Sequence, residues 1–426
     1  MKKTKRLIAV ILALVFALSA LAIPASAKTL TTSKHYDTLT VIGDSVGAGY
    51  GLCDDDSNPF TLENFINMHA GDRVEGSYPD LVAKAVGAKT LYNESREGYS
   101  AGTFLRMLDP EYEEYCAQPE NYLERFYTEC GFIMNKLWHY DDLQNQKVTL
   151  ADHVKAADCV IIQLGSNDIG QYGAGAYMFK ALYYAYGMEF QPALTALKGE
   201  FNAITTLDQL VSMVGGVSTL EEEVNQAEQM FFRNYDKLVK KIRELNPNAD
   251  IYVVGMYNSF KDDEPQDNAL RQYLSNIDEG VLADVKTYMT KTSKYRNVVN
   301  YVDAPDVEYY SYNEFGSLEY LINFLIFLHP THQGHEYIAN QIIYKMNGGN
   351  TATRINRQNY RRLVRSNGVW GVYKSNGDLY TSYTGVAVRN GKYYYVRHGV
   401  WASEFSGIIH VATGSYNVKN GRITSI

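Results

Sequence analysis

The residue of this sequence whose surroundings best suit covalent chemistry is Ser45, which stands in the stretch VIGDSVG at positions 41–47. An apolar run precedes this serine and a glycine-rich turn surrounds it, so we expect it at the carboxyl edge of a sheet, where open α/β sheets place their sites. Small neighbours leave room for a substrate carbonyl. A hydroxyl is a weak nucleophile and needs a base to accept its proton. Ser45 therefore predicts nucleophilic catalysis only if other parts of the chain supply partners.

Three later segments follow Ser45 in a fixed order. They are NESREGYS at 93–100, GSND at 165–168 and HPTHQGH at 329–335. With the stretch around Ser45, they resemble the four sequence blocks of the SGNH (GDSL-like) esterases and lipases, and the resemblance spans nearly all of residues 38–346. Because all four blocks occur in order, coincidence is a poor explanation.

The resemblance assigns a role to one residue of each block. It implies Ser45 as the nucleophile and His329 as the general base, and it implies an oxyanion hole made by the backbone N–H groups of Ser45 and Gly98 and the side-chain amide of Asn167. The chemistry needs these groups, since imidazole titrates near neutrality and the tetrahedral intermediate carries negative charge on oxygen. Losing one oxyanion donor typically costs about 10² to 10³ in rate.

One position departs from the family pattern. The family usually has an aspartate three residues before the histidine, and here that position is Ile326. Three interpretations remain open: a backbone carbonyl near Ile326 orients His329, a more distant carboxylate such as Asp303, Asp306 or Glu319 does so, or the site is inactive. We favour the backbone carbonyl, because a Ser–His pair with an intact oxyanion hole retains useful activity.

Other interpretations of these motifs are weaker. The spacing of His329, His332 and His335 could suggest a metal site, but no carboxylate or cysteine motif with ligand spacing accompanies them and Pro330 marks a helix start. The pattern Gly43-x-Ser45-x-Gly47 also fits the nucleophile turn of an α/β-hydrolase. That assignment leaves the GSND segment without a role. The motifs imply no metal and no cofactor.

The elements that must position these residues can be predicted from hydropathy. Short apolar runs typical of buried parallel strands are separated by helical patterns; the runs cover residues 38–42, 89–92, 159–164, 251–255 and 298–302. The alternation predicts an α/β fold, a three-layer α/β/α sandwich with a mostly parallel sheet, and the resemblance implies the flavodoxin-like SGNH form of it. Residues 109–150 and 170–220 exceed simple crossovers, and we expect these insertions to shape the substrate site.

One helix is predicted in detail. An apolar face recurs at helical spacing from Glu221 to Leu245, and Asn246-Pro247 should stop the helix. Thr219 and Glu222 have the spacing of a capping box at its start.

The two ends of the chain differ from the middle. Basic residues, an apolar run and small residues make residues 1–27 an expected export signal, so the protein should be secreted. No later segment is apolar enough to span a membrane. The formal charge is −21 for residues 28–350 and +9 for residues 351–426, which suggests an acidic body joined to a basic tail.

The tail carries an internal repeat. A unit of about 22 residues with aromatic side chains and Asn-Gly turns recurs after a linker at 347–365, so residues 366–426 should form short β-hairpins that stack. The stretch NGKYYYVRHGVWASEFSGI resembles aromatic-glycine repeats that bind the cell wall in Gram-positive bacteria. That resemblance implies attachment to a wall polysaccharide or related glycan. The alternative is a structural array whose rings pack together.

Cysteines add little. Cys116 and Cys130 are the pair we would test for a disulfide, and Cys159 should be a buried thiol.

Together these features predict a cell-surface serine esterase with its hydrolase domain at residues 28–346, which forms an acyl-enzyme on Ser45 and acts on carboxylic esters such as those of O-acetylated glycans. We expect no nucleic-acid partner. The alternative is an inactive SGNH module that works as a surface-binding protein.

Overall fold

The fold is taken from a computed structural model of the chain. It describes residues 31–50, 52, 73–129, 140–202, 212, 215–258, 269–305, 307, 329–330, 332–349, 361–366, 368–373, 379–381, 383–389, 392–411 and 414–425. The expected signal segment at 1–27 lies outside these ranges. No helix among the described residues is both long enough and apolar enough to cross a bilayer.

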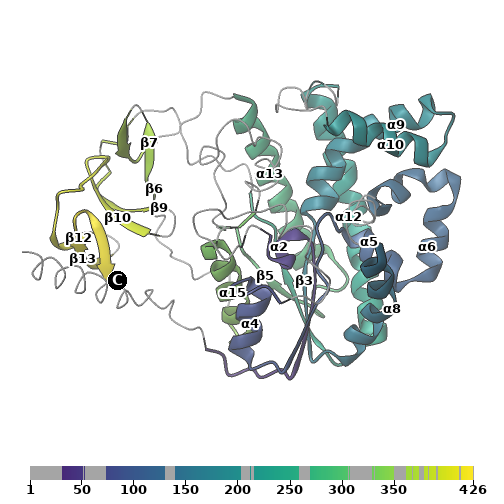
Figure 1. Cartoon of the computed structure of the whole chain (residues 1–426), viewed down its shortest axis with the longest axis horizontal. Helices are drawn as coiled ribbons and strands as arrows, with labels where there is room; N and C mark the ends of the chain where they lie inside the picture. The colour runs from purple at the N-terminus through teal and green to yellow at the C-terminus, as the bar shows by residue number, and fades with distance from the viewer. Residues whose placement is uncertain are drawn as a thin grey trace, which may run out of the picture.

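A five-stranded parallel sheet forms the centre of the first part of the chain (Figure 1). Its strands are β1 (Thr38–Gly43), β2 (Thr90–Asn93), β3 (Cys159–Gln163), β4 (Asp250–Val254) and β5 (Asn300–Val302). Their order is β2-β1-β3-β4-β5, the doubly wound order that places ligand sites beside its first strand. All five predicted strands are confirmed, with shifts of one or two residues at their ends.

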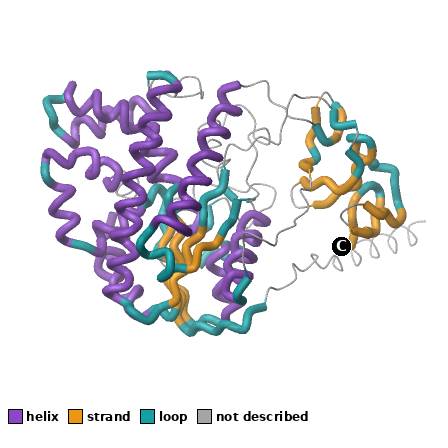
Figure 2. The backbone as a smooth tube through the Cα atoms, turned by 180° about the vertical axis from the view of Figure 1, so that it is seen from behind, coloured by secondary structure: helices purple, strands orange, loops and turns teal. Residues whose placement is uncertain are grey.

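Helices cover both faces of this sheet. The helices within the described residues are α2 (Ser45–Ala48), α4 (Tyr78–Val86), α5 (Ala101–Leu108), α6 (Pro110–Ala117), α8 (Tyr140–Ala156), α9 (Tyr172–Ala185), α10 (Phe190–Asn202), α12 (Val217–Leu245), α13 (Ala269–Thr287) and α15 (His332–Met346), with short 3-10 or π-helical segments η1 (Pro119–Asn121), η2 (Ser166–Gln171) and η3 (Tyr288–Thr292). In Figure 2 the strands of this parallel sheet lie between the two groups of helices.

Side-chain alternation along the strands explains the two covered faces. Leu39 and Val41 of β1 pack in the core shared with α4 and α15, whereas Ile42 packs in the core shared with α5, α8 and α12. Successive strand residues point to opposite faces, so apolar residues at nearly every position require a cover on each side. The predicted α/β/α sandwich is therefore confirmed.

The start of α12 differs from the prediction. The helix begins at Val217, one turn before the expected start, and its N-cap is Gly216 with no side-chain cap. The predicted capping box is wrong, because Thr219 lies inside the first turn and its hydroxyl donates to the Gly215 carbonyl at 3.4 Å. The predicted end at Leu245 is confirmed.

The two cysteines among the described residues are free thiols. Cys116, one of the pair that we would test for a disulfide, is buried beside Leu105 and Tyr112; Cys130 lies outside the described residues. Cys159 is a buried free thiol, as expected.

The two ends of the α/β body are joined by one side chain. The Asn347 amide oxygen accepts hydrogen bonds from the Thr32 hydroxyl at 2.8 Å and the Ser33 N–H at 3.3 Å. Its amide nitrogen donates to the Thr31 carbonyl at 3.1 Å. Asn347, which we expected to open the linker, therefore belongs structurally to the body.

A sheet whose strand pairs are antiparallel except for β6 with β9 forms the C-terminal part of the chain. Its strands are β6 (Arg361–Arg362), β7 (Val364–Ser366), β8 (Val369–Gly371), β9 (Gly385–Arg389), β10 (Lys392–Arg397), β11 (Val400–Trp401), β12 (Gly407–Val411), β13 (Gly414–Lys419) and β14 (Arg422–Ser425). At the β13–β14 turn, Asn420 and Gly421 have φ values of 50° and 71°, as a two-residue Asn-Gly hairpin requires. The sheet begins at Arg361, before the expected boundary at residue 366.

Two glycines allow the first two loops of the body to pack tightly. A Cβ atom added at Gly43 would lie 2.7 Å from the Ser95 hydroxyl oxygen, and one added at Gly47 would lie even closer to it. Ser95 is almost fully buried at 1% exposure. The glycines around the nucleophile turn are thus needed for the approach of the neighbouring loop, in addition to the access for substrate that we expected.

Gly47→Ala should lower the free energy of unfolding by about 1–3 kcal/mol, because the added methyl overlaps the Ser95 side chain. Urea denaturation measures the change. The matched control is Gly280→Ala in α13, where no atom lies within 4 Å of the added Cβ, and which should stabilise the protein by about 0.5–1 kcal/mol. Equal stability of Gly47→Ala and wild type would contradict the packing argument.

Candidate active site

Ser45 begins the short helix α2 directly after β1. The Asp44 carboxylate caps this helix by accepting the Val46 N–H at 2.9 Å, and Gly49 ends it with a φ of 88°. Asp44 and Val46 are buried, whereas Ser45 is partly exposed. The turn therefore holds a rigid backbone and leaves the hydroxyl accessible.

His329 lies against this serine. Its Nε2 atom is 2.7 Å from the Ser45 hydroxyl oxygen, which is hydrogen-bonding distance for a nucleophile and its base. The two residues are 284 positions apart in sequence and are brought together because α15, which begins at His332, packs beside α4. The predicted pairing of Ser45 with His329 is present in the structure.

Backbone hydrogen bonds hold the three strand ends together. The Asp44 N–H donates to the Gln163 carbonyl at 3.3 Å, and the Arg96 N–H donates to the Gly43 carbonyl at 3.1 Å. The loops after β1, β2 and β3 therefore meet at one edge of the sheet. Gly98, in the second of these loops, has a φ of 72°, a left-handed conformation that favours glycine.

Asn167 lies in the third loop and contacts the second. Its side-chain nitrogen donates to the Tyr99 carbonyl at 3.0 Å, next to Gly98 in the chain. A primary amide has two N–H groups, so this contact orients the side chain and leaves one N–H for another acceptor. The two predicted oxyanion donors thus come from loops that are directly bonded to each other.

The buried carboxyl group of Asp168 links the same two loops. Its carboxyl oxygens lie 3.0 and 3.1 Å from the backbone nitrogen of Ala101, the first residue of α5. Ser100 caps α5 in a reciprocal box with Thr103. In the sequence, Asp168 stands out only as the last residue of the GSND segment. Its contact with the first residue of α5 can be found only in the folded structure.

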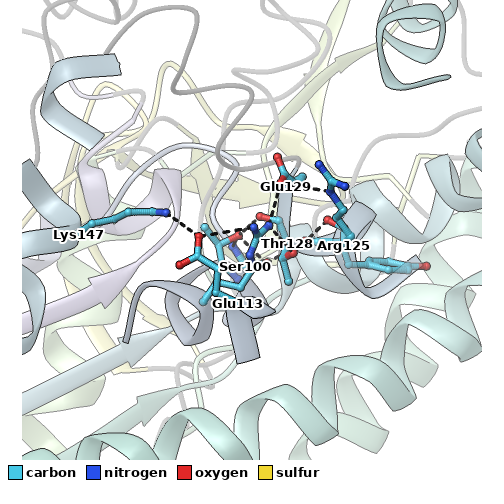
Figure 3. Close-up of polar contacts among 9 residues, drawn as sticks. Ser100, Glu113, Arg125, Thr128, Glu129 and Lys147 are labelled. Atoms are coloured by element: carbon cyan, nitrogen blue, oxygen red, sulfur yellow. Dashed lines mark hydrogen bonds and ion pairs between the residues drawn. The ribbon is translucent and has the colours of Figure 1, made fainter. Parts of the chain in front are cut away.

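Helical residues of the first insertion brace α5 further (Figure 3). The Ser100 hydroxyl donates to the Tyr127 carbonyl at 3.1 Å, and the Thr103 hydroxyl donates to the Thr128 carbonyl at 3.1 Å. Glu129 forms ion pairs with Arg106 at 3.1 Å and Arg125 at 3.5 Å. This part of the insertion supports the loop that carries Gly98.

Two buried carboxyl groups lie behind the serine. Burial raises the pKa of Asp44 to about 7, although the Val46 N–H and the Gln163 side chain oppose the shift. Burial also raises the pKa of Asp168 to about 7, and the nearby charge of Asp44 adds to the increase while the Ala101 N–H lowers it. Both carboxyl groups therefore titrate near neutral pH.

The group that orients His329 was left open by the sequence. Ile326, Asp306 and Glu319 lie outside the described residues, and the carboxylate of Asp303 pairs with the Lys286 ammonium at 2.5 Å.

Tyr50 is an unexpected neighbour of the base. Its ring centroid lies 4.8 Å from that of the His329 imidazole, with a tilt of 37°. The Tyr50 N–H donates to the Ser45 carbonyl at 3.0 Å, so the ring is fixed to the nucleophile turn itself. Burial and the charge of Glu97 raise the pKa of the Tyr50 phenol above its ordinary range. No motif in the sequence marked this residue.

The last histidine of the HPTHQGH segment has a structural contact. His335 is fully buried, and its Nδ1 atom accepts the Tyr78 backbone N–H at 3.3 Å. That bond joins α15 to the start of α4. His332 begins α15, and no cluster of three potential metal ligands occurs in the described part of the chain.

A serine and a histidine in contact at the carboxyl edge of a parallel α/β sheet is the arrangement of a serine hydrolase. The chain belongs to the GDSL-like lipase/acylhydrolase family, whose model matches residues 41–337. This membership agrees with the four blocks identified in the sequence and decides against the α/β-hydrolase assignment.

Solved structures with similar folds include three hydrolases. An extracellular lipase from Streptomyces rimosus is 15% identical over 72% of this chain and 99% of its own, with a TM-score of 0.42. A phospholipase A1 from Streptomyces albidoflavus is 12% identical over 73% and 99%, with a TM-score of 0.38. A carbohydrate acetylesterase from Sinorhizobium meliloti is 12% identical over 73% and 98%, with a TM-score of 0.35. A comparison with curated proteins finds no match.

Asp168→Asn should reduce the fall in stability between pH 5 and pH 8. The folded-state pKa of Asp168 lies above its unfolded value near 4, so the folded protein holds more protons than the unfolded chain in this window. Its contribution is complete below about pH 4 and is lost as the pH rises through 7. Asparagine removes this loss and can still accept the Ala101 N–H.

Urea denaturation at the two pH values should show a difference smaller by on the order of 2 kcal/mol in Asp168→Asn than in wild type. The control is Asp152→Asn. The Lys155 ammonium lowers the pKa of Asp152, so the contribution of this carboxyl changes only below about pH 4. An unchanged pH dependence in Asp168→Asn would mean that this carboxyl does not titrate in the window.

Proposed function

We propose that this protein is a secreted serine esterase that cleaves carboxylic esters through an acyl-enzyme on Ser45. The observation that carries the proposal is the 2.7 Å contact between the Ser45 hydroxyl oxygen and the His329 Nε2 atom. Family membership supports hydrolysis of acyl esters in general. The expected signal at 1–27 supports secretion.

The reaction follows from the positions of these groups. His329 Nε2 accepts the proton of the Ser45 hydroxyl as the oxygen attacks the ester carbonyl, and the Ser45 N–H, the Gly98 N–H and the free amide N–H of Asn167 stabilise the oxyanion. The imidazolium then protonates the leaving alcohol. Water, deprotonated by His329, attacks the acyl-enzyme and releases the carboxylic acid and Ser45.

Tyr50 contributes to the position of the base in this proposal. An imidazole that rotates away from Ser45 cannot accept its proton, and the family aspartate that usually limits rotation is replaced by Ile326. The Tyr50 ring packs against the imidazole, and the Tyr50 backbone is fixed to the nucleophile turn by the hydrogen bond from its N–H to the Ser45 carbonyl. Tyr50 is therefore a positioning residue that limits the motion of His329, together with whatever group contacts Nδ1.

The substrate class follows from the tail. The C-terminal repeats resemble wall-binding repeats, and an esterase attached to a glycan meets acyl groups on that glycan at high local concentration. We propose O-acetylated glycans as substrates and attachment to a wall polysaccharide or related glycan through residues 361–425.

A second candidate function is binding without catalysis. The replacement of the family aspartate by Ile326 favours it, because an unoriented histidine is a poor base. In that case the hydrolase domain is a recognition module on a surface protein.

Ser45→Ala separates the two functions. Wild type should react with a fluorophosphonate probe and hydrolyse p-nitrophenyl acetate, and Ser45→Ala should lose labelling and reduce kcat by about 10⁵-fold or more, because no other group replaces the nucleophile. The control is Ser218→Ala at the exposed start of α12, which should behave as wild type. Wild type that neither labels nor hydrolyses the ester would overturn the esterase proposal in favour of the binding module.

Tyr50→Leu should lower kcat for p-nitrophenyl acetate by about tenfold with little change in KM, because His329 moves more freely without the ring. A tenfold loss corresponds to an activation free energy higher by roughly 1.4 kcal/mol. Tyr50→Phe keeps the ring and should restore kcat to within about threefold of wild type. The pH–rate profile should shift only in Tyr50→Leu. If Phe and Leu are equally impaired, the hydroxyl of Tyr50 matters and the ring contact does not.

A further inference from the structure

We infer that the exposed cations of the C-terminal sheet, rather than its aromatic rings, bind a linear polymer whose charges are phosphate groups. This rests on the proposed attachment function and specifies its ligand. The "basic sheet" below means strands β6 to β14.

The charges of the basic sheet are nearly all positive. Six cationic side chains are exposed or partly exposed there, and Glu404 is the single acid among the described residues of the sheet; the cations are Arg365, Arg389, Lys392, Arg397, Lys419 and Arg422. Within the described residues none of the six forms an ion pair, whereas cations of the α/β body, such as Lys180 with Glu223 at 2.7 Å, commonly do.

Strand pairing places like charges opposite each other. Arg389 faces Lys392 across the β9–β10 hairpin, and Lys419 faces Arg422 across the β13–β14 hairpin. Like charges directly opposite in an antiparallel pair are destabilising. A polyanion bound along these hairpin ends removes that repulsion, which a glycan without charge cannot do.

One pair of guanidinium groups is held close together. Trp370 lies opposite Arg365 in the β7–β8 ladder, and the guanidinium carbons of Arg389 and Arg365 lie 3.9 and 5.9 Å from the Trp370 ring centroid. Stacking on the indole fixes a guanidinium while its N–H groups remain free at the edge. The two arginines come from different strands and converge on one ring.

This convergence favours phosphate over carboxylate. A planar carboxylate matches the fork of one arginine, whereas the tetrahedral oxygens of a phosphate point in several directions and can accept from two guanidinium groups at once. Repeated phosphate groups along a chain also match cations spread over several hairpins.

The rings of the basic sheet are largely used for packing. Tyr394 and Trp401 meet edge to face at 5.5 Å, and Tyr395 and Phe405 meet at 5.0 Å. The Trp401 indole N–H donates to the Gly421 carbonyl at 3.1 Å. Nucleic-acid strands are usually bound by bases that stack on open rings, so these packed rings favour a polymer without bases.

The α/β body should not bind such a polymer. Residues 28–350 have a formal charge of −21, which repels a polyanion at low ionic strength. Attachment through the basic sheet therefore leaves the acidic body unbound.

The test measures binding of the full-length protein to immobilised inorganic polyphosphate by biolayer interferometry, with polygalacturonate, dextran and oligo(dT) as the other ligands. We expect binding to polyphosphate that weakens as salt rises, no binding to dextran, affinity for polygalacturonate at least about tenfold lower, and affinity for oligo(dT) no higher than for polyphosphate. Equal affinity for polygalacturonate overturns the assignment to phosphate, and tighter binding of oligo(dT) favours a nucleic acid.

Variants locate the surface. Arg365→Ala with Arg389→Ala should weaken polyphosphate binding at least about tenfold, and Arg365→Lys with Arg389→Lys should fall between this pair and wild type, because lysine keeps the charge without the fork. The matched control, Lys155→Ala with Lys240→Ala, removes the same charge from exposed positions of the body and should bind as wild type. Equal weakening in the control and the arginine pair overturns the inference.

Hydrolysis of p-nitrophenyl acetate by the same wild-type preparation separates this inference from the proposed catalysis. Protein that binds polyphosphate without hydrolysing the ester contradicts the catalytic proposal alone. Protein that hydrolyses the ester but does not bind polyphosphate contradicts this inference alone.

Discussion

The hydrogen bonds that continue past the ends of β1, β2 and β3 hold the candidate site together. The Asp44 N–H and the Arg96 N–H bond to carbonyls of neighbouring strand ends, so three loops that could diverge stay in register with the sheet. Everything that the site needs depends on this register: the exposure of Ser45, the left-handed turn at Gly98 and the contact of Asn167 with Tyr99. A parallel sheet provides it because all of its strands end at the same edge.

The tightness of this edge has an electrostatic cost. Asp44 and Asp168 accept backbone N–H groups at the starts of α2 and α5, and they do so in a region where water is excluded. Their raised pKa values show that the hydrogen bonds offset only part of the desolvation of two carboxylates. Each of the two acids orders a loop that carries a site residue.

The sequence predicted the parts of the structure that depend on local pattern. Apolar runs located all five parallel strands, since a strand buried on both faces has apolar residues at nearly every position. The pairing of Ser45 with His329 was reached through the family blocks, because no periodicity links residues 284 apart. Glycine at 43 and 47 was associated with substrate access, while the structure adds close packing against Ser95.

Other features could not be reached from the sequence. The contact of Tyr50 with His329 joins two segments without a shared motif, and the anchoring of α5 by Asp168 depends on the spacing of two loops. The capping box failed because α12 starts one turn earlier than its apolar face suggests. The cysteine spacing specified no disulfide framework, and the burial of the free Cys116 thiol beside Leu105 and Tyr112 depends on the packing of α5 and α6.

The hydrogen bonds of Asn347 to the N-terminal segment have a mechanical consequence. Helix α15 runs from His332, just after the base, to Met346, just before Asn347. Tension on the chain beyond residue 349 would otherwise be transmitted along this helix towards His329. The hydrogen bonds of Asn347 to residues 31–33 divert that tension into the N-terminal segment. If the tail attaches the protein to a surface as proposed, the body can be pulled by it while the separation of Ser45 and His329 is preserved.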